Sequence, residues 1–238
     1  MIFDYQMTRA GMHPKNFLEG FNGYLHVDGY AGYGSVINAI RVACVAHLRR
    51  KFVDAEKILP DGAHELSFAR QAINMIGELY GIERKLADQS QEVKYEVRNR
   101  ESIPILRQFK KWLDDMKPEV APKGALGKAI HYAIEQWPAM LRYVDDGKLA
   151  IDNNIAEREI KQLVIGRKNW LFADTPDGAI ANATLYSLVQ TAKANGLEPY
   201  AYLRQVFAAL PNMTTSDEVK QLLPWNICLA EEVELRAA

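Results

Sequence analysis

The stretch Asp152-Asn153-Asn154-Ile155-Ala156-Glu157-Arg158-Glu159-Ile160-Lys161 decides how the rest of the chain is interpreted. Side-chain oxygens of Asp and Asn accept hydrogen bonds from the free amide groups at a helix N-terminus, so this stretch predicts a helix start. The helix is expected to run from near Asn154 to Val164 or Ile165, with Gly166 as its C-terminal cap. The sequence thus places a capped helix late in the chain.

Glu157 has an unusual position on this predicted helix. The apolar residues form one stripe at helical spacing, made of Ala156, Ile160, Leu163 and Val164. Glu157 lies on that stripe, whereas Glu159 does not. A carboxylate on the core-facing side is costly unless positive charge lies nearby. Lys161, one turn on, could supply it in an ordinary i,i+4 pair, which is the cheaper explanation, and a metal ion is the alternative.

The composition is that of an ordinary globular protein. With 238 residues, 48% hydrophobic and 25% charged, the chain is long enough for one large domain or two small ones. The net charge of −1 gives no global attraction to nucleic acid or anionic membranes, so any basic footprint must be local. Cys44 and Cys228 make no disulfide framework. Without an apolar run of about 18 residues or a signal-peptide pattern, we expect a cytoplasmic protein with no membrane partner.

The first sixty residues alternate between strand and helix patterns. The expected strands are Ile2–Thr8, Tyr24–Val27 and Val42–Ala46, and the expected helices lie within 10–20, over Val36–Ile40 and from His47 to about Ile58. This alternation predicts an α/β sheet.

Two features at the ends of these strands are candidates for chemistry. Asp28 follows a strand and precedes the flexible turn at Gly29, where functional residues of α/β sheets are often found. Taken alone, Asp28 is more simply a turn aspartate that binds its own backbone. Cys44 and His47 have the spacing of half a zinc site, but no second pair lies nearby in the sequence. They are better interpreted as a core cysteine and a histidine at a helix start.

The rest of the chain has helical patterns. No strand pattern occurs from Ala63 to about Tyr143, and the last helix of this segment is expected to end near Pro138. Further helices are predicted over Ala179–Asn195, stopped by Gly196, and over Tyr200–Leu210, with an apolar tail at 222–226 that docks back. The run Arg167–Phe172 mixes basic and aromatic residues, which suits either nucleic-acid contact or a core.

These motifs together resemble the insertion-sequence 66 transposase family of bacteria. The matching motifs are Tyr24-Leu25-His26-Val27-Asp28-Gly29-Tyr30-Ala31-Gly32-Tyr33, Ala46–Phe52, Asp152–Arg158, Gly166–Phe172, Leu185–Leu210 and Leu222–Asn226. The resemblance covers nearly the whole chain. It implies an incomplete ribonuclease-H-like sheet domain with a large all-helical insertion and a helical C-terminal segment. The implied boundaries are 1–60 and 149–182 for the two parts of the sheet domain, 61–148 for the insertion and 183–238 for the last segment.

The resemblance also implies an Asp-Asp-Glu site that holds two Mg²⁺ or Mn²⁺ ions. Asp28 would bridge the ions and Glu157 would hold one of them, so we expect these carboxylates to lie near each other. Two such ions activate a water or a 3′-hydroxyl and stabilise the leaving oxygen of a phosphodiester. By resemblance His47 contacts DNA near the scissile phosphate. The residues expected to contact phosphates are Arg49, Arg50, Lys161, Arg167 and Lys168.

The departure from the family is the first aspartate, which in the family precedes the segment that opens this chain. We therefore expect an N-terminally truncated chain that binds metal weakly and cleaves poorly, although its family cuts and joins DNA in an oligomeric transposition complex. The alternatives are a non-catalytic DNA-binding or regulatory remnant, and a metal-dependent hydrolase of another substrate that uses Asp28 and Glu157 alone.

Overall fold

A computed structural model of the chain describes residues 1–60, 62–65, 67–169 and 173–228, without the side chains of 162, 163 and 167–169. The chain divides into two compact units. The central unit comprises residues 9–155, and the terminal unit combines residues 1–8 with residues from 156 onward.

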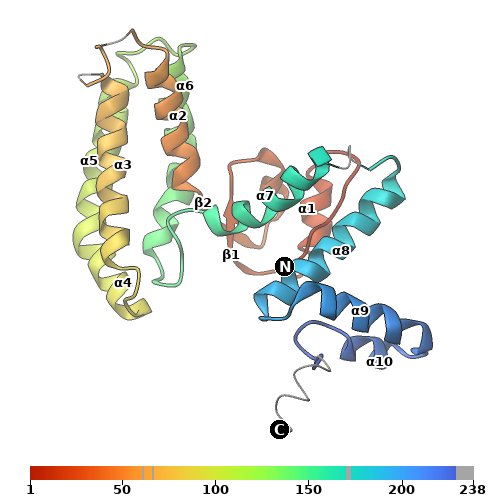
Figure 1. Cartoon of the computed structure of the whole chain (residues 1–238). Helices are drawn as coiled ribbons and strands as arrows, with labels where there is room; N and C mark the ends of the chain where they lie inside the picture. The colour runs from red at the N-terminus through yellow and green to blue at the C-terminus, as the bar shows by residue number, and fades with distance from the viewer. Residues whose placement is uncertain (61, 66, 170–172, 229–238) are drawn as a thin grey trace. The chain divides into compact units, whose positions relative to one another are not determined.

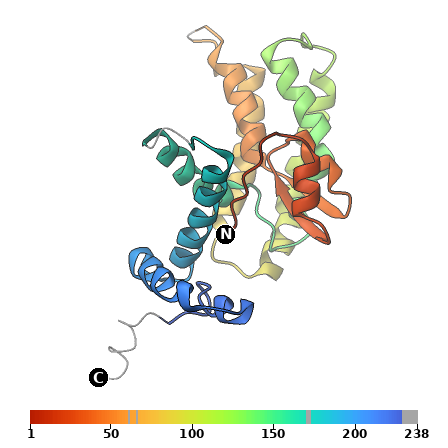
Figure 2. The same ribbon diagram turned by 90° about the vertical axis from the view of Figure 1, so that its right-hand side faces the viewer.

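The central unit contains a small parallel sheet. Strand β1 (Gly23–Val27) pairs with β2 (Ala39–Ala43), and the register matches Gly23 with Ala39 and Val27 with Ala43. The connection between them contains the 3-10 helix η1 (Ala31–Ser35), and helix α1 (Met12–Phe17) packs against η1. Both lie in the part of the chain coloured red to orange in Figure 2. Because the strands are parallel, their carboxyl ends lie at one edge, and the residues that follow them are neighbours.

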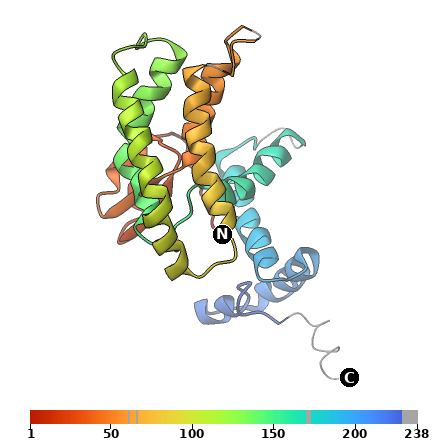
Figure 3. The same cartoon turned by 90° about the vertical axis from the view of Figure 1, so that its left-hand side faces the viewer.

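Helices form the larger part of the central unit. Four long helices, α2 (Val45–Lys57), α3 (Phe68–Lys85), α5 (Ile103–Met116) and α6 (Ala125–Leu141), lie side by side (Figures 1 and 3). Shorter elements connect them: α4 (Gln91–Val97), the π-helical turn η2 (Arg98–Ser102) and the 3-10 turn η3 (Arg142–Val144). Ser67 and Ser90 begin α3 and α4, since each side chain accepts a hydrogen bond from the backbone N–H three residues on.

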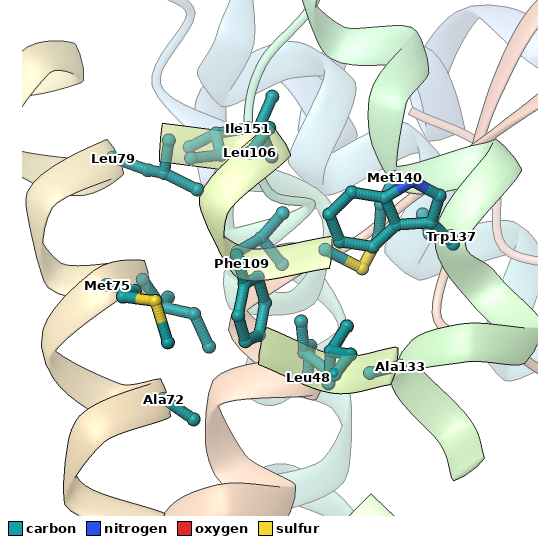
Figure 4. Packing of buried hydrophobic residues seen from close by; sticks show 14 of the residues in the cluster. Leu48, Ala72, Met75, Leu79, Leu106, Phe109, Ala133, Trp137, Met140 and Ile151 are labelled. Atoms are coloured by element: carbon teal, nitrogen blue, oxygen red, sulfur yellow. The ribbon is translucent and has the colours of Figure 1, made fainter. Parts of the chain in front are cut away.

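One hydrophobic core joins the sheet to these helices. Val42 of β2 and Val45 of α2 belong to the same cluster of buried residues as Leu106 and Phe109 of α5. Leu48, Phe109 and Trp137 converge in Figure 4 from α2, α5 and α6. The Phe109 ring lies 5.9 Å from that of Trp137, in an edge-to-face arrangement that favours aromatic pairs. The helical segment, which runs from α3 to η3, therefore packs on the strands and α2 through a shared core.

The terminal unit contains most of α7 (Asn154–Asn169) and all of α8 (Pro176–Ala194), α9 (Pro199–Ala209), η4 (Leu210–Asn212) and α10 (Ser216–Gln221). Its small core includes Ala192 of α8 and Tyr202 and Val206 of α9. Leu222 belongs to the same core, and its carbonyl accepts a hydrogen bond from the Tyr202 hydroxyl at 3.0 Å. The docking of the apolar tail is thereby confirmed at its first residue.

The predicted strand Ile2–Thr8 is wrong. The segment pairs with no strand among the described residues, and side chains of α8 satisfy part of its backbone instead. The Met1 ammonium donates to the Thr191 hydroxyl at 2.8 Å, and the Phe3 N–H donates to the Ser187 hydroxyl at 2.8 Å. The alternating pattern of this segment therefore indicated an extended chain but not its partner.

The described fold is mostly helical with a two-stranded parallel sheet, consistent with α/β, and its ribonuclease-H-like detail stays a prediction.

One predicted helix and two predicted helix ends are also wrong. The expected helix Val36–Ile40 is absent, because residues 36–38 form a turn after η1 and Ala39 and Ile40 begin β2. Helix α6 continues through Pro138 to Leu141, since Trp137 and Met140 are buried on either side and their packing outweighs one lost backbone hydrogen bond. Helix α7 runs through Gly166 to Asn169, because a single glycine costs a helix only about 1 kcal/mol.

The apolar stripe expected on α7 is also exposed in part. Ala156 is exposed and Ile160 is 50% exposed, while Val164 is partly buried. Helical spacing alone therefore did not identify a core-facing side here.

In the part of the chain that the structure describes, no helix is long and apolar enough to span a bilayer.

Candidate active site

Asp28 lies where β1 ends, as predicted, and its carboxylate is exposed. Its Oδ1 accepts a hydrogen bond from the Tyr30 N–H at 3.0 Å, so Asp28 does form the turn that the simpler interpretation required. This bond uses one carboxylate oxygen and orients the side chain at the edge of the sheet. A turn role and a ligand role are therefore compatible at this residue.

The neighbouring strand ends at Cys44, which lies beside the end of β1. The Cys44 N–H donates to the Val27 carbonyl at 3.1 Å and continues the strand pairing by one residue. Cys44 is 2% exposed and is the N-cap residue of α2, and His47 lies in the first turn of that helix. The prediction of a core cysteine next to a helix-start histidine is confirmed.

The loop that leads into α7 is attached to this same edge. The Ile151 carbonyl accepts a hydrogen bond from the Val45 N–H at 3.1 Å. The Asn153 N–H donates to the Cys44 Sγ at 3.2 Å. The start of the predicted glutamate helix is therefore held at the junction of β2 and α2, although more than a hundred residues separate it from Cys44 in sequence.

Asp152 caps α7 as the sequence predicted. Its Oδ1 accepts a hydrogen bond from the Asn154 N–H at 3.1 Å, and its Oδ2 accepts one from the Asn154 side-chain amide at 2.7 Å. The same Oδ2 accepts a hydrogen bond from the Tyr80 hydroxyl of α3 at 2.9 Å. Burial lowers the pKa of His26 on β1, an effect that the negative charge of Asp152 opposes.

Two tyrosines from the helical segment reach this edge and were not identified from the sequence. Tyr80 of α3 donates to Asp152, and the Tyr132 hydroxyl of α6 donates to the Asp28 carbonyl at 3.2 Å. Burial raises the pKa of Tyr80, and the hydrogen bond to Asp152 raises it further. Burial also raises the pKa of Tyr132, with Asp28 adding to the effect. Both phenols therefore stay protonated as donors. Helical spacing in the sequence gave no signal for either contact.

Glu157 lies in the first turn of α7, partly buried, within the terminal unit. Its proximity to Asp28 and its pairing with Lys161 both stay predictions.

The predicted DNA-contacting residues fall into two groups. Arg49 and Arg50 of α2 and Lys161 of α7 are exposed, and His47 is partly buried. The side chains of Arg167 and Lys168, and residues 170–172 of the basic and aromatic run, lie outside the described residues.

The family matches define the chain as a protein of the transposase class. Residues 1–181 match the model of the Transposase IS66 family, and residues 187–225 match that of the IS66 C-terminal element. The chain belongs to the IS66 transposase family, which confirms the resemblance drawn from its motifs.

Curated relatives come from Sinorhizobium fredii (strain NBRC 101917 / NGR234). The uncharacterized protein y4jD is 36% identical over 232 residues, covering 93% of this chain and 44% of y4jD. The uncharacterized protein y4qI is 34% identical over 237 residues, covering 95% of this chain and 43% of y4qI. The chain thus spans less than half the length of the curated relatives it matches. No solved structure matches the chain.

Proposed function

We propose that this chain is part of the catalytic region of a transposase and acts in cutting and joining DNA at the ends of an insertion element. Membership of the IS66 family supports a role in transposition and DNA recombination. The observation that carries the catalytic assignment is the attachment of the loop before Glu157 to the edge where Asp28 ends β1. The bonds from Val45 to Ile151 and from Asn153 to Cys44 make that attachment.

Asp28 and Glu157 are the proposed metal ligands, and Mg²⁺ or Mn²⁺ the proposed ions. Asp28 fits this role because its carboxylate is exposed at the strand end and its turn hydrogen bond uses only one oxygen. Oxygen ligands of this kind suit hard divalent cations. When bound, such ions supply an activated water or 3′-hydroxyl and stabilise the leaving oxygen of a phosphodiester. The protein's own contribution is to hold these carboxylates at the ends of rigid elements.

The DNA backbone is the proposed partner of the exposed basic residues. Arg49 and Arg50 lie on the helix that starts at the same edge as Asp28, and Lys161 lies one turn beyond Glu157. Phosphate contacts of this kind fix the register of the DNA without reading its sequence. His47 is the proposed contact nearest the scissile phosphate, and Arg167 and Lys168 extend the set by family resemblance. A homo-oligomeric transposition complex is part of the same proposal.

We propose that the isolated chain binds metal weakly and cleaves poorly. The family uses three carboxylates, and only Asp28 and Glu157 match its motifs in this sequence. A two-carboxylate site holds a divalent pair less firmly because fewer negative ligands offset the charge of the two ions. A non-catalytic DNA-binding or regulatory role is the alternative, and it is the lack of a match to the third carboxylate that favours it, whereas Asp28 and Glu157 favour the catalytic role.

Mn²⁺ binding to the full chain, followed by water-proton relaxation, tests the site. Replacing Asp28 by Asn or Glu157 by Gln is expected to weaken binding by about tenfold or more. Glu159→Gln is the matched control, because Glu159 is also a partly buried carboxylate of α7 but, two residues from Glu157, lies on another face of the helix. Equal effects at Glu157 and Glu159 would argue against the assigned ligand.

Strand cleavage with Mg²⁺ or Mn²⁺ tests the activity. Little cleavage by the isolated chain is expected, on DNA that carries insertion-element ends. Robust turnover that Glu157→Ala abolishes would support the site and overturn the proposal of weak activity. Metal-independent binding to DNA that survives Asp28→Asn would favour the non-catalytic alternative.

A further inference from the structure

The helical segment contributes one hydroxyl to each of two loops at the candidate site. Tyr132 of α6 donates to the Asp28 carbonyl, and Tyr80 of α3 donates to the Asp152 carboxylate. Tyr80, Tyr132, Asp28 and Asp152 all belong to the central unit. Both contacts join residues more than seventy positions apart, so neither is a consequence of local helix or turn geometry.

Tyr132 is closely fitted to the turn that follows Asp28. Gly29 has a φ of +87°, a conformation that residues with a side chain rarely adopt, and a Cβ there would lie 2.5 Å from the Tyr132 hydroxyl. The Lys51 ammonium lies 5.6 Å from the centre of the Tyr132 ring, in cation–π range. The Tyr132 ring is thus contacted by Lys51, while its hydroxyl binds the backbone of Asp28.

Tyr80 holds the start of α7 through the capping residue. The Asp152 carboxylate accepts from the Asn154 N–H, which begins the helix, and from the Tyr80 hydroxyl, which belongs to α3. The neighbouring Asn153 N–H is bound by the Cys44 sulfur. The two residues just before the helix that carries Glu157 are therefore tied to α3 and to the N-cap of α2.

We propose that Tyr80 and Tyr132 are positioning residues, through which the helical segment holds the loop of Asp28 and the start of the Glu157 helix in the geometry that metal binding requires. The inference rests on the proposed function for the identity of the ligand. The inference gives the helical segment a function of its own: besides packing on the sheet, it fixes the positions of the two loops at the candidate site.

Tyr132→Phe and Tyr80→Phe in the full chain test the proposal, with Mn²⁺ alone as the probe. Each variant removes one hydrogen bond and keeps the ring, so Mn²⁺ affinity is expected to fall about two- to tenfold. Tyr95→Phe is the control, since Tyr95 is an exposed tyrosine of α4 away from either loop. In the Asp28→Asn background, Tyr132→Phe is expected to cause no further loss of affinity.

Amide hydrogen exchange gives a readout that needs no metal. Tyr80→Phe is expected to speed exchange at residues 152–155 and Tyr132→Phe at 28–30, with other parts of the central unit unchanged. Gly29→Ala, which displaces the Tyr132 hydroxyl, is a second variant with the same expected direction as Tyr132→Phe. Unchanged exchange and affinity in folded Phe variants would overturn the inference. A wild-type chain whose Mn²⁺ binding does not depend on Asp28 would instead overturn the proposed function, while the exchange data would still test the positioning.

Discussion

At the scale of single residues, Arg98 is the most buried charged residue among those described in the central unit. Its side chain is 2% exposed, and its guanidinium makes a two-point contact with Glu83, with N–O distances of 2.8 and 2.7 Å. The remaining Nη1 donates to the carbonyls of Tyr143 and Asp146 at 2.9 and 3.1 Å. Arg98 thereby links α3, η2 and the turn after η3, and its charge is both paired and hydrogen-bonded.

Arg98→Met is predicted to destabilise the central unit strongly, because it leaves the Glu83 carboxylate, whose side chain is only 15% exposed, without its partner. Breaking such a buried pair costs about 3–5 kcal/mol. The measurement is urea unfolding followed by the fluorescence of Trp112 and Trp137, both of which pack in the central core.

Arg100→Met is the matched control for that prediction. Arg100 is next but one to Arg98 and pairs with Glu101, but its side chain is 68% exposed. Exposed ion pairs contribute about 0–1 kcal/mol to stability, so the midpoint of urea unfolding of Arg100→Met should stay close to that of the unmodified chain. Equal losses in the two variants would contradict the role assigned to the buried pair.

At the scale of elements, the start of α10 depends on a titratable cap. The Glu218 carboxylate accepts hydrogen bonds from the Thr214 and Thr215 N–H groups at 2.7 and 3.0 Å, and the Thr215 hydroxyl accepts one from the Glu218 N–H. These two threonine amides hold the pKa of Glu218 below its ordinary value. A carboxylate with a lowered pKa stabilises the folded state above its unfolded pKa and loses that contribution as pH falls through the folded value.

The capping interaction of α10 is therefore predicted to weaken on acidification. Below about pH 4, the ordinary range for Glu, the amides of Thr214 and Thr215 should lose protection, measured as the ratio of the intrinsic to the observed hydrogen-exchange rate at each pH. Glu218→Gln should flatten this pH response, whereas Asp217→Asn, at a neighbouring exposed carboxylate, should leave it intact. A response that persists in Glu218→Gln would assign it to another group.

Local chemistry made several elements predictable from the sequence. Asp152 and Asn154 mark the start of α7, and α8 ends just before Gly196, which adopts a φ of +77°. Asp28 was identified because a carboxylate at a strand end has a definite topological place. Such signals lie within a few residues of the feature they predict.

Features set by distant partners could not be predicted in the same way. Met1 and Phe3 take partners on α8, nearly two hundred residues away, so their extended pattern gave no correct pairing. Pro138 remains within α6 because of the packing on either side of it. The Tyr132 contact with Asp28 spans 104 positions and depends on how α6 docks on the sheet. The tyrosine contacts that hold the candidate site depend on such distant partners, so the sequence did not predict them. The position of the Asp28 carboxylate depends only on the end of β1, so the sequence did predict it.

At the scale of the whole molecule, charge limits how the chain can bind DNA. Its 29 Lys and Arg residues are offset by 30 Asp and Glu residues, so the molecule has no overall attraction for a polyanion. Affinity for DNA would have to come from a few local contacts, and the exposed Arg49 and Arg50 of α2 are the proposed ones. Each neutralised phosphate releases condensed counterions, which makes binding fall with salt in proportion to the number of contacts.

DNA binding by the full chain is accordingly predicted to be weak and to depend on salt with a small slope. If Arg49, Arg50 and Lys161 are the main contacts, the slope of log K against log salt on duplex DNA should be about −3. Arg49→Ala and Arg50→Ala should each reduce its magnitude by about 1. Lys111→Ala is the control, because Lys111 is an exposed lysine of α5 that pairs with Asp115. A slope that falls equally in the control would mean that binding is diffuse rather than centred on α2, and a salt-independent affinity would exclude phosphate contacts as its source.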